Sequence, residues 1–71
     1  MKYYTIENNK DVIFAGDVND GKNDIVKYFV KRSDGSYREF PNNDANADFR
    51  CFSALKAGTL QTFSTLEQAK N

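Results

Sequence analysis

The sequence of 71 residues lacks the side chains that most catalytic and metal sites need. It contains no histidine and no tryptophan, and it has one cysteine and one proline. Without histidine, neither a Cys–His pair nor a Ser–His–Asp triad can form. A zinc site needs about four Cys or His ligands, and Cys51 is the one residue of either type. We therefore expect a protein that is not an enzyme and binds no cofactor or metal, with Cys51 as a small buried core residue.

Long apolar runs and an excess of one charge are also lacking. No stretch approaches the roughly 20 apolar residues that cross a membrane, and the N-terminus has no secretory pattern. A single cysteine cannot form an internal disulfide, which favours a cytoplasmic chain. Lys and Arg total 10, as do Asp and Glu. This balance gives neither the strongly basic charge of a typical nucleic-acid-binding domain nor the acidic charge of a nucleic-acid mimic.

Aromatic residues are the most prominent feature that is present. Six Phe and four Tyr make up 14% of the chain. The length allows a single small domain, residues 1–71, and such a chain buries only about 60% of its unfolded surface. An aromatic side chain left outside so small a core forms a surface patch, and exposed apolar patches are typical of interaction surfaces.

Four segments in the first part of the chain combine alternating apolar and polar residues with β-branched and aromatic types. They are residues 3–7, 12–18, 25–32 and 36–40. Residues 25–32 also fit a helix, because several of their apolar side chains share a helical face. The turn signal Ser33-Asp34-Gly35 that follows favours a strand and a hairpin. We therefore expect three or four antiparallel strands in a meander, joined first at Asn8-Asn9.

The second predicted turn covers residues 17–24 and is centred on Asn19-Asp20-Gly21. Residues 16–23 nearly match the phosphate-binding pattern G-x-x-x-x-G-K-[ST]. However, Asn23 stands where a hydroxyl would hold Mg²⁺, and two aspartates lie where phosphates would bind. We interpret the segment as a hairpin turn and not as a nucleotide site.

A helix is predicted in the segment that follows Pro41. Its apolar residues recur every three positions, at Phe49, Phe52 and Leu55. Asn43 or Asp44 is a suitable N-cap, and Gly58 fits the position just past the C-terminus. Residues 44–48 also resemble the first half of a calcium loop. The glycine and the bidentate glutamate that such a loop needs are missing, so calcium binding there is only a minor alternative.

The last residues predict a short strand and a second helix. Residues 59–63 are the strand candidate. Ser64-Thr65-Leu66-Glu67 matches a capping box, in which Ser64 caps the helix and Glu67 reaches back to the Ser64 amide. The helix would cover residues 65–70. The expected fold is α+β, with a small antiparallel sheet of three to five strands, an N-terminal meander, and one or two short C-terminal helices packed on it.

Basic and aromatic residues alternate in the hairpin at residues 25–40. Lysine and arginine can contact phosphates while rings stack on bases, which is the chemistry of single-strand nucleic-acid binding. Ordinary strand alternation, with long charged side chains protecting a sheet edge, explains the same pattern. In the N-terminal Tyr3-Tyr4 pair, one ring must point away from whatever the other packs on. The candidate partner-binding residues are Tyr3, Tyr28, Lys31, Arg32, Tyr37 and Arg38.

Two function hypotheses follow. The first is a small binding protein that acts through a protein partner, for which a Tyr- and Phe-rich sheet between patches of opposite charge is suited. Chains of this size include regulators, inhibitors and accessory proteins, some encoded by phages or mobile elements. The alternative is single-stranded nucleic-acid binding through the basic aromatic hairpin. A homodimer stays open in either case, because a thin core gains from burying a further face or edge.

Overall fold

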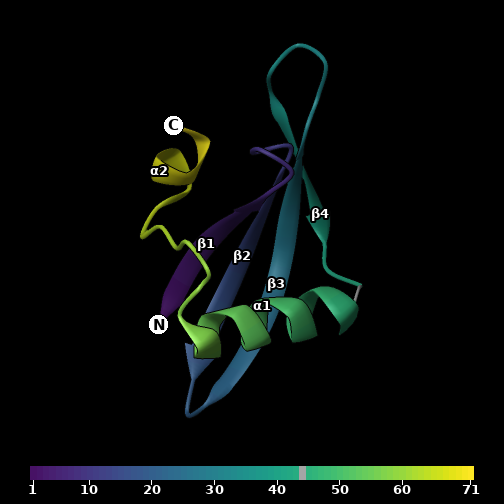
Figure 1. Ribbon diagram of the computed structural model, residues 1–71. Helices are drawn as coiled ribbons and strands as arrows, with labels where there is room; N and C mark the ends of the chain where they lie inside the picture. Colours follow the sequence, from purple (N-terminus) through teal and green to yellow (C-terminus); the bar gives the residue numbers. More distant parts are fainter. Residues whose placement is uncertain (44) are drawn as a thin grey trace.

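The sheet and helices match the α+β expectation. The computed structural model describes residues 1–43 and 45–71, apart from the side chains of residues 45, 46, 48, 49 and 52. Its elements are β1 (Lys2–Glu7), β2 (Val12–Asn19), β3 (Lys22–Lys31), β4 (Tyr37–Pro41), α1 (Ala45–Ala57) and α2 (Leu66–Lys70). The strands form one antiparallel sheet in the order β1-β2-β3-β4, so the predicted meander is confirmed (Figure 1).

The segment that could have been helical is strand β3, and its turn to β2 is tighter than expected. Asp20 and Gly21 have φ angles of 50° and 77°, the positive pair that a two-residue type I′ hairpin turn requires. The predicted turn over residues 17–24 is therefore wrong in its extent, since both strands continue up to this pair. The segment resembling a phosphate-binding loop is a plain β-hairpin, as predicted.

One irregularity interrupts the pairing of β2 with β3. Ala15 pairs with Lys27 and Gly16 pairs with Ile25, which leaves Val26 as an extra residue on β3. This is a β-bulge, a feature that bends a strand and redirects a side chain. Because Val26 is an extra residue, the β3 residues before and after it still point to the same face of the sheet as the β2 residues with which they pair.

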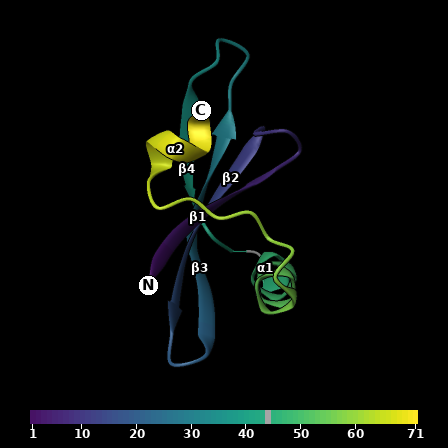
Figure 2. The same ribbon diagram turned by 60° about the vertical axis from the view of Figure 1, so that its left-hand side comes forward.

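The two helices lie on opposite faces of the sheet. One buried cluster joins Ala47 and Cys51 of α1 to side chains of the sheet, namely Tyr3, Phe14 and Ile25. The other joins Ala69 of α2 to the sheet residues Ile13, Ala15 and Phe29. Successive strand residues point to opposite faces, so the two clusters are separated by the sheet itself. We call these the α1 face and the α2 face, and Figure 2 shows one helix on each side.

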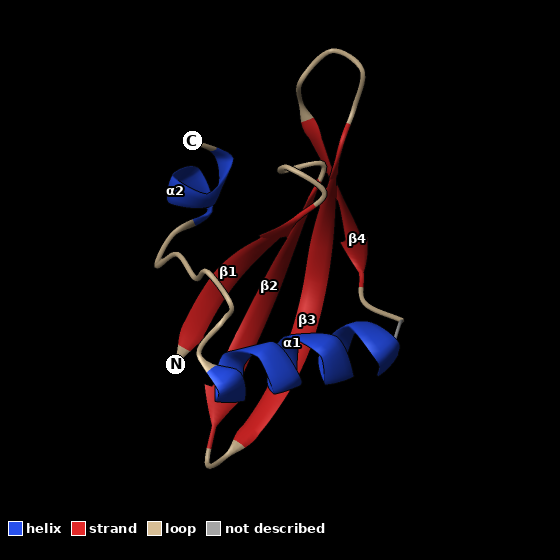
Figure 3. Cartoon of the chain, in the orientation of Figure 1, coloured by secondary structure: helices blue, strands red, loops and turns tan. Residues whose placement is uncertain are grey.

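Each helix covers only one end of its face. In Figures 1 and 3, α1 runs across the strands near the turn at Asp20-Gly21. Helix α2 lies toward the opposite end, where Leu66 and Phe63 pack against the cluster around Ile13 and Phe29. The ends left open are therefore diagonal to one another across the sheet.

The chain passes from one face to the other around the β1 edge. Tyr4 and Phe63 exchange two backbone hydrogen bonds, with N···O distances of 2.9 and 2.8 Å. The Thr5 hydroxyl donates to the Gln61 carbonyl at 2.8 Å. The strand predicted over residues 59–63 is thus reduced to a single bridge at Phe63. This segment covers edge strand β1, while β4 forms the other edge.

Helix α1 ends as the sequence predicts. The Gly58 N–H donates to Leu55 and the Thr59 N–H donates to Ala54, at 3.2 and 3.0 Å. With Gly58 at a φ of 75°, this is the Schellman arrangement. The proposed cap Asp44 lies outside the described residues. The backbone of residues 45–48 is helical, whereas a calcium loop would need them in a loop conformation.

Helix α2 begins one residue later than predicted. Thr65, not Ser64, is the N-cap, and its hydroxyl oxygen accepts from the Gln68 N–H at 3.2 Å. The Gln68 side chain in turn accepts from the Ser64 N–H at 3.0 Å. The expected reach of Glu67 back to Ser64 is therefore wrong. A second pattern of the same kind, Thr-x-x-Gln over residues 65–68, is offset from the first by one residue and sets the start of the helix.

Candidate functional site

Tyr3, which we expected as an exposed anchor, is a core residue with 3% of its surface exposed. Its ring lies across Gly16, where an added Cβ would come within 2.4 Å of the ring. Its hydroxyl donates to the Asn23 Oδ1 at 2.6 Å in a buried position. The expectation of an exposed Tyr3 is wrong because α1 covers the face to which Tyr3 points. Tyr4 points to the opposite face and is half-buried.

The other candidate residues of the hairpin do not share one surface. Val30 pairs with Arg38, and Lys31 pairs with Tyr37, so Arg38 lies on the α1 face and Tyr37 on the α2 face. Tyr28 joins Arg38 on the α1 face, and Lys31 joins Tyr37 on the α2 face. The basic aromatic hairpin is thus split by strand alternation. Arg32 follows the strand and starts the turn.

Tyr37 serves the structure of its own end of the sheet. Its hydroxyl donates to the Lys10 carbonyl at 2.8 Å, which ties β4 to the β1–β2 turn. The Lys70 ammonium of α2 lies 5.5 Å from the centroid of its ring. Such a cation–π contact contributes to docking α2 on this face. Tyr37 is therefore engaged within the chain on both its ring and its hydroxyl.

Three aromatic residues lie side by side on the α1 face, one from each of strands β2, β3 and β4. Phe14 pairs with Tyr28, and Tyr28 pairs with Phe40. The Tyr28 and Phe40 rings are stacked, with centroids 5.3 Å apart and planes 16° apart, and the Phe14 ring is tilted at 6.2 Å from Tyr28. The Arg38 guanidinium lies 4.9 Å from the Phe40 centroid. We call Phe14, Tyr28 and Phe40 the aromatic row.

Sequence reasoning found Tyr28 and Arg38 but missed Phe14 and Phe40. The signal for Phe40 was present, because a hairpin turning at Ser33-Asp34-Gly35 places residue 40 opposite residue 28. The signal for Phe14 was weaker, since the partner of Tyr28 on β2 depends on where the bulge at Val26 falls. A bulge cannot be located from residue types alone.

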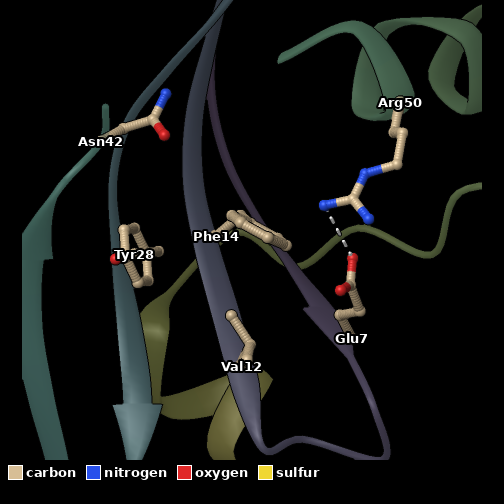
Figure 4. Close-up of a pocket in the computed structure, with 6 residues that line it drawn as sticks. All are labelled: Glu7, Val12, Phe14, Tyr28, Asn42 and Arg50. Atoms are coloured by element: carbon tan, nitrogen blue, oxygen red, sulfur yellow. Dashed lines mark ion pairs between the residues drawn. The ribbon is translucent and has the colours of Figure 1, made fainter. Parts of the chain in front are cut away.

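A cavity of about 230 Å³ opens between the aromatic row and the first half of α1. We call it the aromatic groove, and Figure 4 shows its lining: Glu7, Val12, Phe14, Tyr28, Asn42 and Arg50. Phe14 and Tyr28 form the floor, and Arg50 reaches from α1 toward Glu7 at 3.6 Å across one side. Both ends of this ion pair are solvent-accessible, at 57% and 39%, so it contributes little to stability. The Asn42 amide donates to the Ile25 carbonyl at 2.9 Å.

The groove has an apolar floor and a rim with one charge of each sign, which suits an apolar side chain flanked by polar groups. Among the described residues, no group of three or more His, Cys, Asp or Glu is placed to hold a metal ion. In the same part of the chain, no helix is long and apolar enough to cross a membrane. Cys51 is buried at 6% exposure, as predicted.

Comparisons with protein-family models, with curated proteins and with solved structures give no match.

Proposed function

We propose that the chain is a small non-enzymatic binding protein that acts through a protein partner, as a regulator, an inhibitor or an accessory protein. The observation that carries this proposal is the open half of the α1 face. There Tyr28 and Phe40 of the aromatic row, together with the aromatic groove, lie beside α1, and no further helix or strand of the described residues covers them (Figures 1 and 4). We propose that the partner docks on this half-face.

The open half-face follows from the dimensions of its elements. Strand β3 has 10 residues, which span roughly 33 Å at about 3.3 Å per residue. A helix that crosses a sheet covers about 10–12 Å of it. Helix α1 therefore leaves most of the length of β3 beyond its own footprint. Sheet faces of this kind are ordinarily packed against another layer.

The residues of this half-face have the chemistry of a protein interface. Tyr, Phe and Arg are enriched in protein interfaces and dominate their binding energy. Tyr28 and Phe40 are half-buried and rigidly held, since each ring stacks on the other. Arg38 is exposed, and it packs its guanidinium against Phe40. Rings held in this way lose little conformational freedom on binding, which favours affinity.

The orientation of the rings favours a protein over single-stranded nucleic acid. Bases stack on ring faces that point outward from a sheet. Tyr28 and Phe40 are directly paired across neighbouring strands and are nearly parallel at 5.3 Å. One face of each ring is therefore turned toward the other ring and is less accessible to a base.

The distribution of cations supports the same choice. A nucleic-acid backbone is bound by several cations gathered along one path. Here Arg38 lies on one face of the hairpin and Lys31 on the other. Arg50 pairs with Glu7, and Lys27 pairs with Glu39 at 2.8 Å.

Arg38 and Lys31 provide a matched pair of variants for a test. Both are exposed cations at neighbouring positions of one hairpin, but they lie on opposite faces. The tagged chain and its Arg38→Ala and Lys31→Ala variants would be used to capture proteins from lysate of the encoding organism, with and without nuclease. We expect one stoichiometric protein that survives nuclease and is reduced about tenfold or more by Arg38→Ala but not by Lys31→Ala.

Two other results would overturn the proposal. Equal retention of the partner by both variants would exclude docking on the α1 face. Capture of nucleic acid that falls steeply with salt, and that both substitutions reduce, would favour the alternative of single-stranded nucleic-acid binding. Far-ultraviolet circular dichroism of each variant verifies that the sheet is intact, as expected for changes at exposed positions.

A further inference from the structure

The sheet has two edges, and the described chain covers only one of them. Edge strand β1 is bonded by the returning segment at residues 61–63, through the hydrogen bonds of Tyr4 and Thr5. Strand β4 forms the other edge (Figure 1). Among the described residues, α1 packs on β3 and α2 packs on β1 and β2, so neither helix lies along β4. An open edge of this kind is a template for an added strand.

The hydrogen bonds between β3 and β4 show which backbone groups of β4 point outward. At one end of the pair, the Arg32 N–H donates to the Ser36 carbonyl at 2.6 Å. At the other end, the Asn42 N–H donates to the Val26 carbonyl at 3.4 Å. In an antiparallel pair, every second residue of a strand is bonded to the neighbouring strand. The even-numbered residues of β4 therefore point their backbone groups to β3, and the odd-numbered residues point theirs outward.

Three residues of β4 turn their backbone groups to the open edge: Tyr37, Glu39 and Pro41. Tyr37 and Glu39 each present an N–H and a carbonyl, whereas Pro41 presents a carbonyl only. These backbone groups have no hydrogen-bond partner among the described residues. A proline whose missing N–H lies on the outer side is typical of an edge strand. It also ends the ladder of donors, so this edge is suited to a short extended segment.

The side chains along this edge carry one charge that is not compensated. Arg38 lies on the α1 face with its guanidinium against Phe40, and it has no acidic partner among the described residues. On the α2 face, Glu39 already forms an ion pair with Lys27 at 2.8 Å. Because Arg38 and Phe40 are bonded to β3, an added antiparallel strand would meet them at positions without hydrogen bonds, where opposing side chains are closest.

We propose that the partner adds a short extended segment to β4 as a further antiparallel strand. The segment carries an acidic residue opposite Arg38 and an apolar residue opposite Phe40, which gives the order apolar-x-acidic along its sequence. The acidic side chain pairs with the guanidinium, and the apolar one extends the aromatic row by one strand. Strand addition at a sheet edge is a known mode of peptide recognition. The inference rests on the proposed function, since it names how the partner is held at the same half-face.

A second copy of the chain fits this edge less well than a different protein. With a two-fold axis through Glu39, the two glutamates would lie directly opposite each other. With the axis through Arg38, the two arginines would do so. Like charges directly opposite each other destabilise a strand pair. The edge therefore favours a partner of complementary charge over self-association.

Selection of a phage-displayed random peptide library on the immobilised full chain tests the proposal. We expect enriched peptides with the apolar-x-acidic pattern. Glu39→Pro removes one outward N–H without removing a hydrogen bond to β3, and it should weaken their binding about tenfold or more. Glu39→Ala is the matched variant that keeps the N–H, and it should weaken binding far less. Selection on Arg38→Ala should no longer enrich the acidic residue.

Amide hydrogen exchange provides a second readout that needs no variant. In the free chain, the N–H groups of Tyr37 and Glu39 should exchange fast, and those of Arg38 and Phe40 should exchange slowly. An enriched peptide should protect Tyr37 and Glu39 selectively, because an added strand bonds to these two N–H groups. This readout decides the proposal if circular dichroism shows that Glu39→Pro unfolds the chain.

Three results would overturn the proposal. They are the lack of any enriched peptide, bound peptides that leave the Tyr37 and Glu39 amides unprotected, and protection of these amides by a higher protein concentration alone, which would show pairing of two copies. A partner captured from lysate that requires Arg38 but tolerates Glu39→Pro would dock on the α1 face without strand addition. In that case the proposed function stands and only this inference fails.

Discussion

The two faces of this sheet are built from alternate residues of the same strands, yet they have different surfaces. On the α1 face, Phe14 and Tyr28 are large rings that stand beside a groove. Their immediate neighbours in sequence, Ala15 and Lys27, line a shallow hollow on the α2 face. Each face is covered by a helix at one end only, and the two covered ends are diagonal. A chain of 71 residues thus presents two different surfaces from one alternation of strand residues.

The adjacent residues Tyr3 and Tyr4 test this difference most strongly. Tyr3→Ala should lower the free energy of unfolding by about 3–5 kcal/mol, the range for truncating a large buried ring. Tyr4 is only half-buried, so Tyr4→Ala should cost about 1 kcal/mol. Urea unfolding of each variant measures both values. Equal costs for the two substitutions would contradict the deeper burial of Tyr3 on the α1 face.

A milder variant separates the ring of Tyr3 from its hydroxyl. Tyr3→Phe keeps the packing over Gly16 and removes the hydrogen bond to Asn23, whose amide nitrogen is already buried without a hydrogen-bond partner in the described structure. We expect a loss of about 1 kcal/mol. This variant remains measurable if Tyr3→Ala unfolds, since a chain of this length holds only about 4–10 kcal/mol of stability.

Sequence reasoning could predict the strands because their signals are local. Turn residues such as Asp20-Gly21 and the alternation on either side of them lie within a few positions of one another. The face on which a strand residue is buried, in contrast, depends on elements that are distant in the sequence. Tyr3 and Tyr4 alternate in an obvious way, but only the position of α1, more than 40 residues later, decides which of the two is covered.

The same limit explains the error at the start of α2. Ser64-x-x-Glu67 and Thr65-x-x-Gln68 are both acceptable capping boxes, and they differ by one residue. A shift of one residue turns a helix by about 100°. The rotation of α2 about its own axis is set by the side of the helix that packs on the sheet, where Ala69 is fully buried. Local capping signals alone cannot decide between two overlapping patterns when packing selects the phase.

Removing the cap tests how firmly the α2 face is covered. Thr65→Ala should lower the stability by about 1 kcal/mol, the usual value for a lost N-cap hydroxyl. Ser64→Ala should change it by less than about 0.5 kcal/mol, because only the backbone of Ser64 takes part in the cap. Thermal unfolding of the two variants compares them directly. A larger effect at Ser64 than at Thr65 would contradict the observed start of α2.

The smallest expected effect concerns the turn between β3 and β4. The register that this turn sets places Arg38 on the α1 face and Tyr37 on the α2 face. In this turn the Asp34 carboxylate accepts from the Ser36 hydroxyl at 2.7 Å and from the Ser36 N–H at 2.9 Å. These hydrogen bonds hold the pKa of Asp34 below its ordinary value of 3.8, with the hydroxyl as the larger cause. The contribution of the carboxylate to stability is therefore complete above the unfolded pKa and is lost as the pH falls through the folded pKa.

An NMR titration of the Asp34 carboxyl carbon should show this low pKa directly, and Ser36→Ala should raise it toward the ordinary value. Ser36→Ala removes the hydroxyl but keeps the backbone N–H, so the pKa should recover only in part. Ser33→Ala is the control, and it should leave the titration unchanged. Since the carboxylate is exposed, stability should hardly change, but acid should loosen this turn before the sheet unfolds. If Asp34 titrates at its ordinary value, the turn does not depend on this contact, and strand pairing alone sets the faces of Arg38 and Tyr37.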